Sequence, residues 1–203
     1  MERRLSMAKM QSTLKNMAVS LTLISLVAST ALGFVYEFTK EPIEISKLNK
    51  KLEAIRQVVP EFTNNPNDEM FMIPTGEGDS LEVYPAKNGE ELVGYAIRSY
   101  TEKGFSGYIG FMVGFRPDGT IYNINVLEHK ETPGLGTKLV PEGTADKPSF
   151  KDQFKDKDPA VFALKVKKDG GPVDAITAAT ISSRAFCDGV QRAYNAFEKG
   201  GLK

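Results

Sequence analysis

Residues 108–127 read YIGFMVGFRPDGTIYNINVL, and this stretch decides the class of fold. Two largely apolar runs, Tyr108–Phe115 and Thr120–Leu127, flank Pro117-Asp118-Gly119, which is typical of the turn between two antiparallel strands. Apolar residues alternate with asparagines in the second run, which predicts one buried and one polar face. The alternating residues are Tyr122, Ile124 and Val126, with Asn123 and Asn125 between them. The stretch therefore predicts an antiparallel hairpin.

The sequence before this stretch predicts a second hairpin. Leu81–Tyr84 and Glu91–Tyr100 flank Lys87-Asn88-Gly89, a turn sequence favoured where the backbone needs positive φ. After the first hairpin, Phe162–Val166 is rich in apolar residues and is predicted to be a further strand, ending before Gly170-Gly171-Pro172.

Helical patterns lie on both sides of the predicted strands. Glu41-Pro42 predicts a break in the chain, with proline suited to the first turn of a new helix. Leu48, Leu52, Ile55 and Val59 recur at helical spacing, so an amphipathic helix is predicted to begin near this break and to end at Pro60. Residues 61–79 are rich in Asn, Pro, Gly and Asp and are expected to form an irregular loop. Antiparallel hairpins with helices at either end predict an α+β fold.

The segment that follows residue 127 contains His129-Lys-Glu-Thr-Pro-Gly-Leu-Gly136. Pro133-Gly134 and Gly136 favour a tight turn and let another group approach the backbone closely. A dinucleotide-binding fingerprint is excluded because Leu139 stands in the place of its third glycine and no helical pattern follows. His129 is the only histidine, so it belongs to no multi-histidine metal site, and a surface or capping role is expected. By itself the segment predicts a turn.

Asp174-Ala-Ile-Thr-Ala-Ala-Thr180, continued by Ile181-Ser182-Ser183, lies where the last helix is expected to begin. A helix N-terminus offers free N–H groups and partial positive charge, which stabilise a bound phosphate. Taken alone, however, the segment fits an ordinary Ser/Thr-capped helix better. Gly200-Gly201 ends the helical pattern. Its apolar residues are Ile181, Ala185, Phe186, Val190, Ala193 and Phe197.

The N-terminal region predicts a membrane anchor. Ala18–Tyr36 contains no charged residue, and a helix of this length, rising about 1.5 Å per residue, roughly crosses the hydrocarbon core of a bilayer. Aromatic residues at its outer end match an interfacial belt. Residues 1–16 carry a net charge of +3, from Arg3, Arg4, Lys9 and Lys15 against Glu2. This asymmetry places the N-terminus in the cytoplasm and the rest of the chain outside.

A cleaved signal peptide is the competing interpretation of this region. Ser29-Thr30-Ala31 resembles a small-residue cleavage site, and the stretch is only moderately apolar. The length of the uncharged run and its continuation to Phe38 favour an anchor.

Composition excludes several classes of function. The net charge is zero, with 26 basic and 26 acidic residues, so the chain lacks the basic excess of a nucleic-acid-binding protein. Its one cysteine, Cys187, excludes an internal disulfide and is expected to be a small buried residue of the last helix. The sequence contains no P-loop, nucleophile elbow or Cys-x-x-Cys, so redox chemistry would require an added cofactor.

The single N-terminal span, the HKETPGLG turn at 129–136 and DAITAATISS at 174–183 together resemble a known family. It comprises the covalent-FMN subunits of two related bacterial respiratory pumps. One is the G subunit of the Rnf ferredoxin:NAD⁺ oxidoreductase complex, and the other is the C subunit of the Na⁺-translocating NADH:quinone reductase. The resemblance covers nearly the whole chain. The compact length and Lys130 look more like the Rnf protein.

The resemblance implies specific site residues. In the family, a Ser/Thr-Gly-Ala-Thr string carries FMN on its last threonine through a phosphoester bond, which a dedicated flavin transferase installs. The matching position is Thr180, and Asp174, Thr177 and Ala179 also match, whereas Ala178 stands where glycine is usual. We expect the added methyl group to be tolerated. The turn implies further, non-covalent contacts to the flavin from Glu131, Thr132, Leu135 and Gly136.

The implied function is electron transfer by one covalently bound FMN, without an independent catalytic site or a metal. The protein would act in an Rnf-type inner-membrane complex that couples ferredoxin:NAD⁺ electron transfer to Na⁺ or H⁺ translocation. Its expected partners are the other subunits, the flavin transferase and membrane lipid, with no nucleic acid. The alternatives are the quinone-reductase counterpart, a stand-alone extracytoplasmic flavin carrier, and a cofactor-free anchored binding module in which residues 174–183 only cap a helix.

The expected organisation follows from these predictions. Residues 1–16 form a cytoplasmic N-terminus, 17–38 a transmembrane helix, 39–60 a juxtamembrane amphipathic helix, and 61–203 an extracytoplasmic FMN-binding domain.

Overall fold

The computed structural model describes residues 13–76, 78–141, 143 and 148–202, and the chain divides into two compact units, Met1–Asn49 and Lys50–Lys203. Helix α1 is continuous from Leu14 to Val58 and has Pro42 in its interior. The sequence prediction of a break at Glu41-Pro42 is therefore wrong. Proline removes one intrahelical hydrogen bond, but the residues on both sides remain compatible with a helix, so the helix continues through Pro42.

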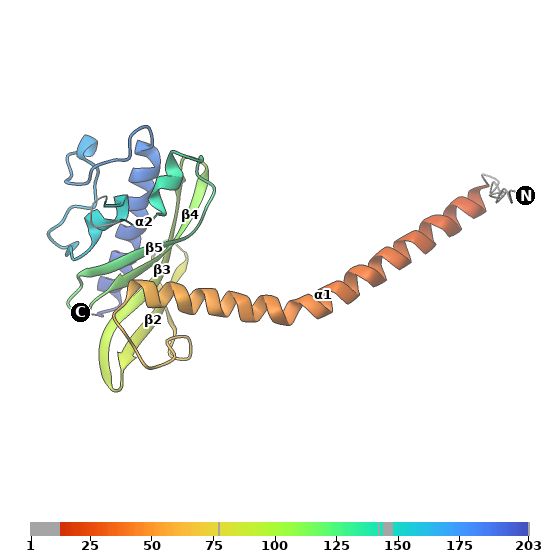
Figure 1. Ribbon diagram of the computed structural model, residues 1–203, viewed down its shortest axis with the longest axis horizontal. Coiled ribbons are helices and arrows are strands. Elements are labelled where there is room, and N and C mark those ends of the chain that lie inside the picture. The colour runs from red at the N-terminus through yellow and green to blue at the C-terminus, as the bar shows by residue number, and fades with distance from the viewer. Residues whose placement is uncertain (1–12, 77, 142, 144–147, 203) are drawn as a thin grey trace, which may run out of the picture. The chain divides into compact units, whose positions relative to one another are not determined.

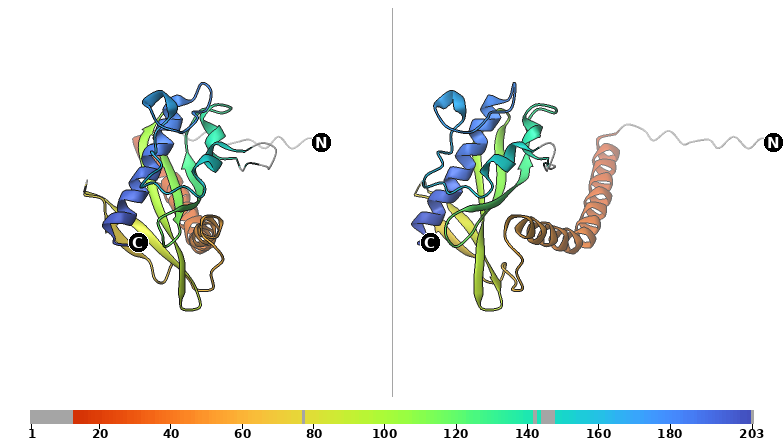
Figure 2. Two further views of the ribbon diagram at one scale, coloured as in Figure 1. Left: turned by 90° about the vertical axis from the view of Figure 1, so that its left-hand side faces the viewer. Right: turned by 60° about the vertical axis from the view of Figure 1, so that its left-hand side comes forward.

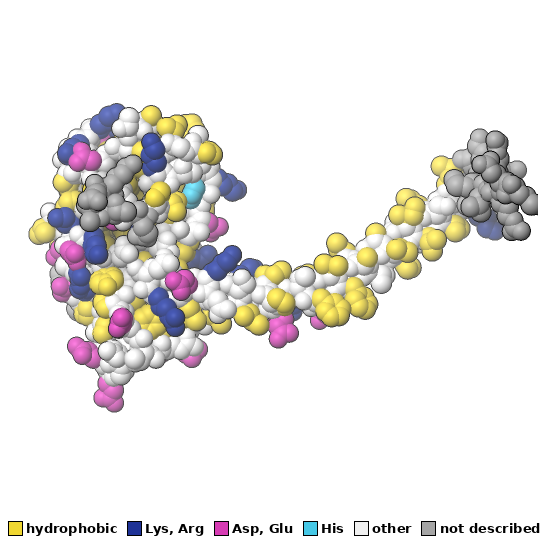
Figure 3. Space-filling model, viewed as in Figure 1, with side chains coloured by type: hydrophobic (Ala, Val, Ile, Leu, Met, Phe, Trp, Pro, Cys, Tyr) yellow, Lys and Arg dark blue, Asp and Glu magenta, His cyan; other side chains and the backbone are white. Residues whose placement is uncertain are grey.

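The N-terminal part of α1 has an apolar surface. An 18-residue window of this helix has a mean hydropathy of 2.0, and none of it is buried in the structure, so the helix is long and apolar enough to cross a membrane. Figure 3 shows hydrophobic side chains along it. The hydroxyls of Thr22, Ser29 and Thr30 donate hydrogen bonds to carbonyls four residues earlier, at 2.7–2.9 Å. Such bonds satisfy hydroxyl groups that would have no other partner inside a bilayer.

The second unit is built on an antiparallel sheet with the strand order β1-β2-β3-β4-β5 (Figure 1). The strands are β1 (Phe71–Pro74), β2 (Ser80–Asn88), β3 (Glu91–Gly104), β4 (Gly107–Phe115) and β5 (Ile121–His129). Both predicted hairpins are confirmed, as β2–β3 and β4–β5. Strand β1 lies within the segment expected to be an irregular loop, so the prediction for residues 61–79 is wrong at these four positions.

Helix α2 (Thr180–Lys199) lies along one face of this sheet (Figure 2). Its apolar residues contact the sheet; for example, the rings of Phe186 and Phe111 meet edge to face with centroids 5.2 Å apart. The predicted buried face of this helix is confirmed except at Ile181, which is 49% exposed. The main hydrophobic core therefore lies between α2 and the sheet.

The last residues of α1, which belong to the second unit, cover the opposite face. Ile55 and Val58 are fully buried there against Tyr84 and Met112. The polar face predicted for β5 contacts the same helix end: the side-chain amides of Asn123 and Asn125 donate to the backbone and side-chain oxygens of Gln57, at 2.8 and 2.7 Å. The unit therefore has three layers, helix–sheet–helix.

The segment after β5 has little regular structure. It contains short 3-10 helices, η1 (Gly136–Leu139), η2 (Phe150–Phe154) and η3 (Lys167–Asp169). The strand predicted at Phe162–Val166 is not formed, and only Val166 makes an isolated bridge, to Val173. Apolar residues here, including Leu164 and Val166, are buried in the core without pairing along a strand. Burial alone therefore accounts for the apolar run that suggested a strand.

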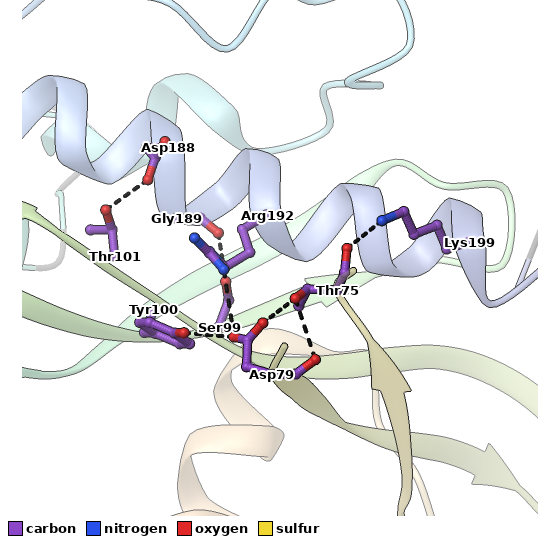
Figure 4. Close-up of polar contacts among 9 residues, drawn as sticks. All are labelled: Thr75, Asp79, Ser99, Tyr100, Thr101, Asp188, Gly189, Arg192 and Lys199. Atoms are coloured by element: carbon purple, nitrogen blue, oxygen red, sulfur yellow. Dashed lines mark hydrogen bonds and ion pairs between the residues drawn. The ribbon is translucent and has the colours of Figure 1, made fainter. Parts of the chain in front are cut away.

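Polar contacts also hold α2 to the sheet (Figure 4). The hydroxyl of Ser99 donates to the Gly189 carbonyl, and the hydroxyl of Thr101 donates to Asp188, both at 2.7 Å. Near the end of the helix, Arg192 forms an ion pair with Asp79, with 3.5 Å between the nitrogen and the oxygen. These contacts fix the helix, and hence its N-terminal residue Thr180, against β3 and the residue before β2.

Candidate functional site

A cavity of about 290 Å³ opens at the N-terminus of α2. Both segments singled out in the sequence line it, although they are about 45 residues apart along the chain. The residues that line it are Phe105, Glu131, Thr132, Leu135, Gly136, Ala178, Ala179, Thr180, Ile181 and Ser182. Of the site residues predicted from sequence, only Thr177 is not among them; its side chain is exposed.

Thr180 is the first residue of α2, and its side chain is partly exposed at the cavity. The residue before it, Ala179, is the N-cap, and no side chain of the described residues caps this helix end. Free N–H groups and the partial positive charge of the helix therefore face the cavity. This geometry argues against an ordinary Ser/Thr cap and fits an anion beside the Thr180 hydroxyl.

Two serines in the first turn of α2 serve to fix the site rather than to cap the helix. The buried hydroxyl of Ser183 donates to the Ala179 carbonyl and accepts from the Ile176 N–H, both at 3.0 Å. Ser182, also buried, donates to the Glu131 carboxylate. The two bonds of Ser183 thereby hold the segment that leads to Thr180, from Ile176 to Ala179, against the first turn of α2.

The backbone at position 178 favours glycine, the residue that the resemblance implies there. The Ala179 N–H donates to the Ile176 carbonyl at 2.9 Å, which closes a four-residue turn. Ala178 is the third residue of that turn and has φ = 61°, the left-handed conformation that this position requires in a type II turn. An L-residue with a Cβ adopts it at a cost of about 1–2 kcal/mol. Alanine is accommodated here, but with strain that glycine would not have.

Glu131 connects three segments beneath the cavity. It is 4% exposed, and its carboxylate accepts hydrogen bonds from the Ser106 N–H, at 3.0 Å, and from the Ser182 hydroxyl. A Cβ on Gly136 would collide with Glu131 and with Ser182, so the turn must have glycine at this position. The hydrogen bonds from Ser106 and Ser182 supply partners for both buried carboxyl oxygens of Glu131. Glu131 thus joins the β3–β4 turn, the segment after β5 and α2.

A basic side chain approaches Thr180 from η3. The ammonium group of Lys168 lies 3.4 Å from the Thr180 hydroxyl oxygen and donates to it. The next residue, Asp169, accepts two hydrogen bonds from the guanidinium group of Arg184, at 2.6 and 2.7 Å. These hydrogen bonds hold the pKa of the Asp169 carboxyl below its ordinary value. Sequence reasoning missed Lys168, because no motif includes it.

Phe105 is another residue that sequence reasoning missed. It lies in the turn between β3 and β4 and is 66% exposed, although it lines the cavity. Leu135 and Ile181 are the other large apolar side chains that line it, and both are exposed as well. The cavity thus combines apolar side chains with a positively charged end at Thr180. Such a site suits a flat apolar ring attached to an anionic group.

His129 and Cys187, the other residues that the sequence analysis considered for a functional role, have structural roles. The imidazole Nδ1 of His129 accepts a hydrogen bond from the Glu131 N–H at 3.2 Å, so His129 caps the turn, as expected. Cys187 is buried, and burial raises the pKa of its thiol to about 12. Within the described residues, no group of three or more His, Cys, Asp or Glu side chains could hold a metal ion.

Comparison with known proteins identifies a matching domain family and relatives that cover most of the chain. Residues 104–195 match the model of the FMN-binding domain family. The chain is 35% identical over 184 residues to the G subunit of the ion-translocating oxidoreductase complex of Pasteurella multocida, covering 86% of this chain and 89% of that protein.

Two further G subunits of such complexes are similarly close. That of Shewanella amazonensis is 31% identical over 190 residues, which cover 90% of this chain and 87% of the relative. That of Stutzerimonas stutzeri is 33% identical over 178 residues, which cover 87% and 77%. The similarity thus extends well beyond the domain that contains the cavity.

Proposed function

The chain belongs to the family of G subunits of ion-translocating oxidoreductase complexes, and on that premise we propose that it carries one FMN joined covalently to Thr180. Membership makes the chain an electron-transport subunit of a membrane complex, and its FMN-binding domain contains the cavity at α2. Within an Rnf-type complex, the protein would relay electrons in the reaction that couples ferredoxin:NAD⁺ electron transfer to Na⁺ or H⁺ translocation.

One observation carries the proposal of a covalent bond. The Thr180 hydroxyl stands at an N-terminus of α2 that no side chain of the described residues caps, at a cavity lined by both motif segments. A phosphodiester at this oxygen would lie at the positive end of the helix dipole, beside the Lys168 ammonium group. The residues therefore fit the phosphate end of FMN.

The chain's own residues would hold and position the cofactor. When bound, FMN supplies one- and two-electron transfer chemistry. The exposed side chains of Phe105, Leu135 and Ile181 offer apolar surface beside Thr180, where they would contact the flavin and exclude water. Glu131 accepts hydrogen bonds from Ser106 in the β3–β4 turn and from Ser182 in α2, so it fixes the elements that carry Phe105 and Ile181.

A covalent bond has a physical rationale if the domain lies outside the cytoplasm. Free FMN is scarce there, so a dissociable cofactor would be lost by mass action. Attachment requires a flavin transferase and an activated flavin nucleotide as the donor. The bond between Thr180 Oγ and phosphorus forms as the bond from phosphorus to the donor's leaving group breaks, and the hydroxyl proton passes to a base.

The comparisons favour this proposal over a stand-alone flavin carrier and over a cofactor-free binding module. Their names describe subunits of an ion-translocating oxidoreductase complex, which supports an Rnf-type role over a stand-alone flavin carrier. The match to an FMN-binding domain is what a cofactor-free binding module would lack.

The decisive experiment is production of the full chain with and without a flavin transferase. We expect an intact mass higher by FMN minus one water, ultraviolet fluorescence of the denatured protein in a gel, and the added mass on the peptide that contains Thr180. Thr180→Val should abolish all three signals. Thr132→Val, which removes a hydroxyl from the same cavity, is the matched control and should keep them.

Circular dichroism of Thr180→Val would establish that the variant is folded. A wild-type chain without added mass after production with the transferase would contradict the proposal. So would FMN that remains attached in Thr180→Val.

A further inference from the structure

The position of Lys168 is electrostatically unusual. Its ammonium group donates to the hydroxyl of Thr180, the first residue of α2. A cation near a helix N-terminus opposes the helix dipole, whereas acidic residues are favoured there. The first turn of α2, Thr180–Ser183, contains no acidic residue that would offset this charge. With the helix end alone as its neighbour, the placement of Lys168 is unfavourable.

The loop that carries Lys168 is nevertheless firmly held. The Lys167 N–H donates to the Val173 carbonyl at 2.8 Å, and the Val173 N–H donates to the Lys165 carbonyl at 3.1 Å. Gly170, with φ = 81°, ends η3 and turns the chain back.

A side-chain contact anchors the same loop to α2. The guanidinium group of Arg184, one turn after Thr180, binds both carboxylate oxygens of Asp169, the residue after Lys168. A bidentate pair of this kind fixes orientation as well as distance. These contacts hold the backbone at Lys168 beside the first turn of α2, and from there its exposed side chain reaches the Thr180 hydroxyl.

We propose that Lys168 supplies the countercharge for the phosphodiester at Thr180, and that the Asp169–Arg184 pair keeps it in place. The inference rests on the proposed attachment of FMN to Thr180. A phosphodiester carries one negative charge, and lysine is a common point-charge partner of phosphate groups. Attachment of FMN turns the repulsion between Lys168 and the helix end into a favourable arrangement of cation, anion and dipole.

The neighbouring Lys167 provides a matched control. It lies in the same 3-10 helix and is exposed, but its ammonium group forms an ion pair with Asp174, 2.7 Å between the nitrogen and the oxygen. Replacement of either lysine by glutamine removes one positive charge from the same short segment. The two variants differ in whether the lost charge faces Thr180.

The test compares thermal unfolding midpoints of the full chain in detergent, with and without attached FMN. Lys168→Gln should lower the midpoint of the flavinylated form by roughly 1–4 °C, the size expected of one screened charge interaction in a chain of this length. It should leave the flavin-free form unchanged or slightly more stable. The difference should vanish at about 1 M salt, where the Debye length is short. Lys168→Arg should behave as the wild type, and Lys167→Gln should shift both forms equally.

Two outcomes would overturn the role of Lys168 while leaving FMN on Thr180 in place. In one, Lys168→Gln shifts both forms equally; in the other, Lys167→Gln reproduces its effect. If Lys168→Gln accepts no FMN, attachment in Lys168→Arg decides: wild-type extent supports the proposal and failure rejects it. A wild-type chain that gains no mass with the transferase rejects the proposed function itself, and this inference with it.

Discussion

At Ala178 the backbone adopts a left-handed conformation that a residue with a Cβ atom disfavours. Its φ of 61° is set by the turn that the Ala179 N–H closes onto Ile176, and that turn delivers the chain to Thr180. Glycine would adopt this conformation without a steric cost. The methyl group projects from a residue that lines the cavity and is exposed, so the strain is local and is not relieved by burial.

Ala178→Gly should therefore stabilise the protein by about 1 kcal/mol, because relief of left-handed strain outweighs the greater freedom of glycine in the unfolded chain. The thermal unfolding midpoint should rise by roughly 2–4 °C. Ala175→Gly is the control: residue 175 lies in the same segment without positive φ, so glycine there should lower the midpoint. A lower midpoint for Ala178→Gly would refute the strain.

Asp188 links α2 to β3 at the scale of whole elements. Burial disfavours its charge, but hydrogen bonds from Lys103 and Thr101 outweigh that effect and lower the pKa of the carboxyl. A carboxyl group with a lowered folded-state pKa stabilises the fold above its unfolded pKa, near 3.9. That contribution is lost as the pH falls through the lower, folded value. The contact between α2 and the sheet is therefore expected to weaken in acid.

We expect Asp188→Asn to reduce the acid sensitivity of the fold. Unfolding midpoints measured between about pH 5 and pH 2 should fall less steeply than those of the wild type, because an amide does not titrate. Thr101→Val keeps the carboxyl but removes one donor, so it should reduce the slope only partly. An unchanged slope in Asp188→Asn would show that other carboxyl groups dominate acid unfolding.

Local signals explain which elements could be predicted from the sequence. The β2–β3 and β4–β5 hairpins have turn residues and alternation within a few positions of each other, so both are recognisable. Strand β1 has four residues, of which only Ile73 is buried, so it shows no alternation to detect. At Pro42 the error is the opposite one. Proline is a strong local signal for a helix break, but the helix-compatible residues on both sides outweigh it, and no break occurs.

The residues of the candidate site also divide into those that a sequence motif reveals and those that it does not. Thr180 and the 129–136 turn are recognisable because each lies in a contiguous motif. Lys168 and Phe105 are not, because bonds between residues far apart in sequence place them. Arg184 holds the residue next to Lys168, and Glu131 binds the N–H of the residue next to Phe105. Contacts between residues far apart in sequence leave no periodic pattern from which they could be predicted.

Charge asymmetry around the apolar segment governs the topology expected of the whole molecule. Residues 1–16 carry a net charge of +3 and precede the part of α1 that is apolar enough to cross a membrane. From this asymmetry, the positive-inside rule predicts that this end lies in the cytoplasm and the FMN-binding domain on the other side. The proposed covalent attachment of FMN depends on this orientation for its rationale.

Reporter fusions test that orientation. Alkaline phosphatase, which is active only outside the cytoplasm, should be active when fused after Lys203, and a green fluorescent protein at the same point should stay dark. Fluorescence without phosphatase activity at Lys203 would invert the proposed topology.

The burial of Cys187 has a practical consequence for spectroscopy. It is the chain's one cysteine, and a hidden, protonated thiol reacts poorly with maleimide and methanethiosulfonate reagents. A second cysteine placed on the surface, for example by Val161→Cys at a position that is 87% exposed, would thus be labelled selectively. A spin label or dye could then be attached at a chosen distance from Thr180, with the native sequence otherwise intact.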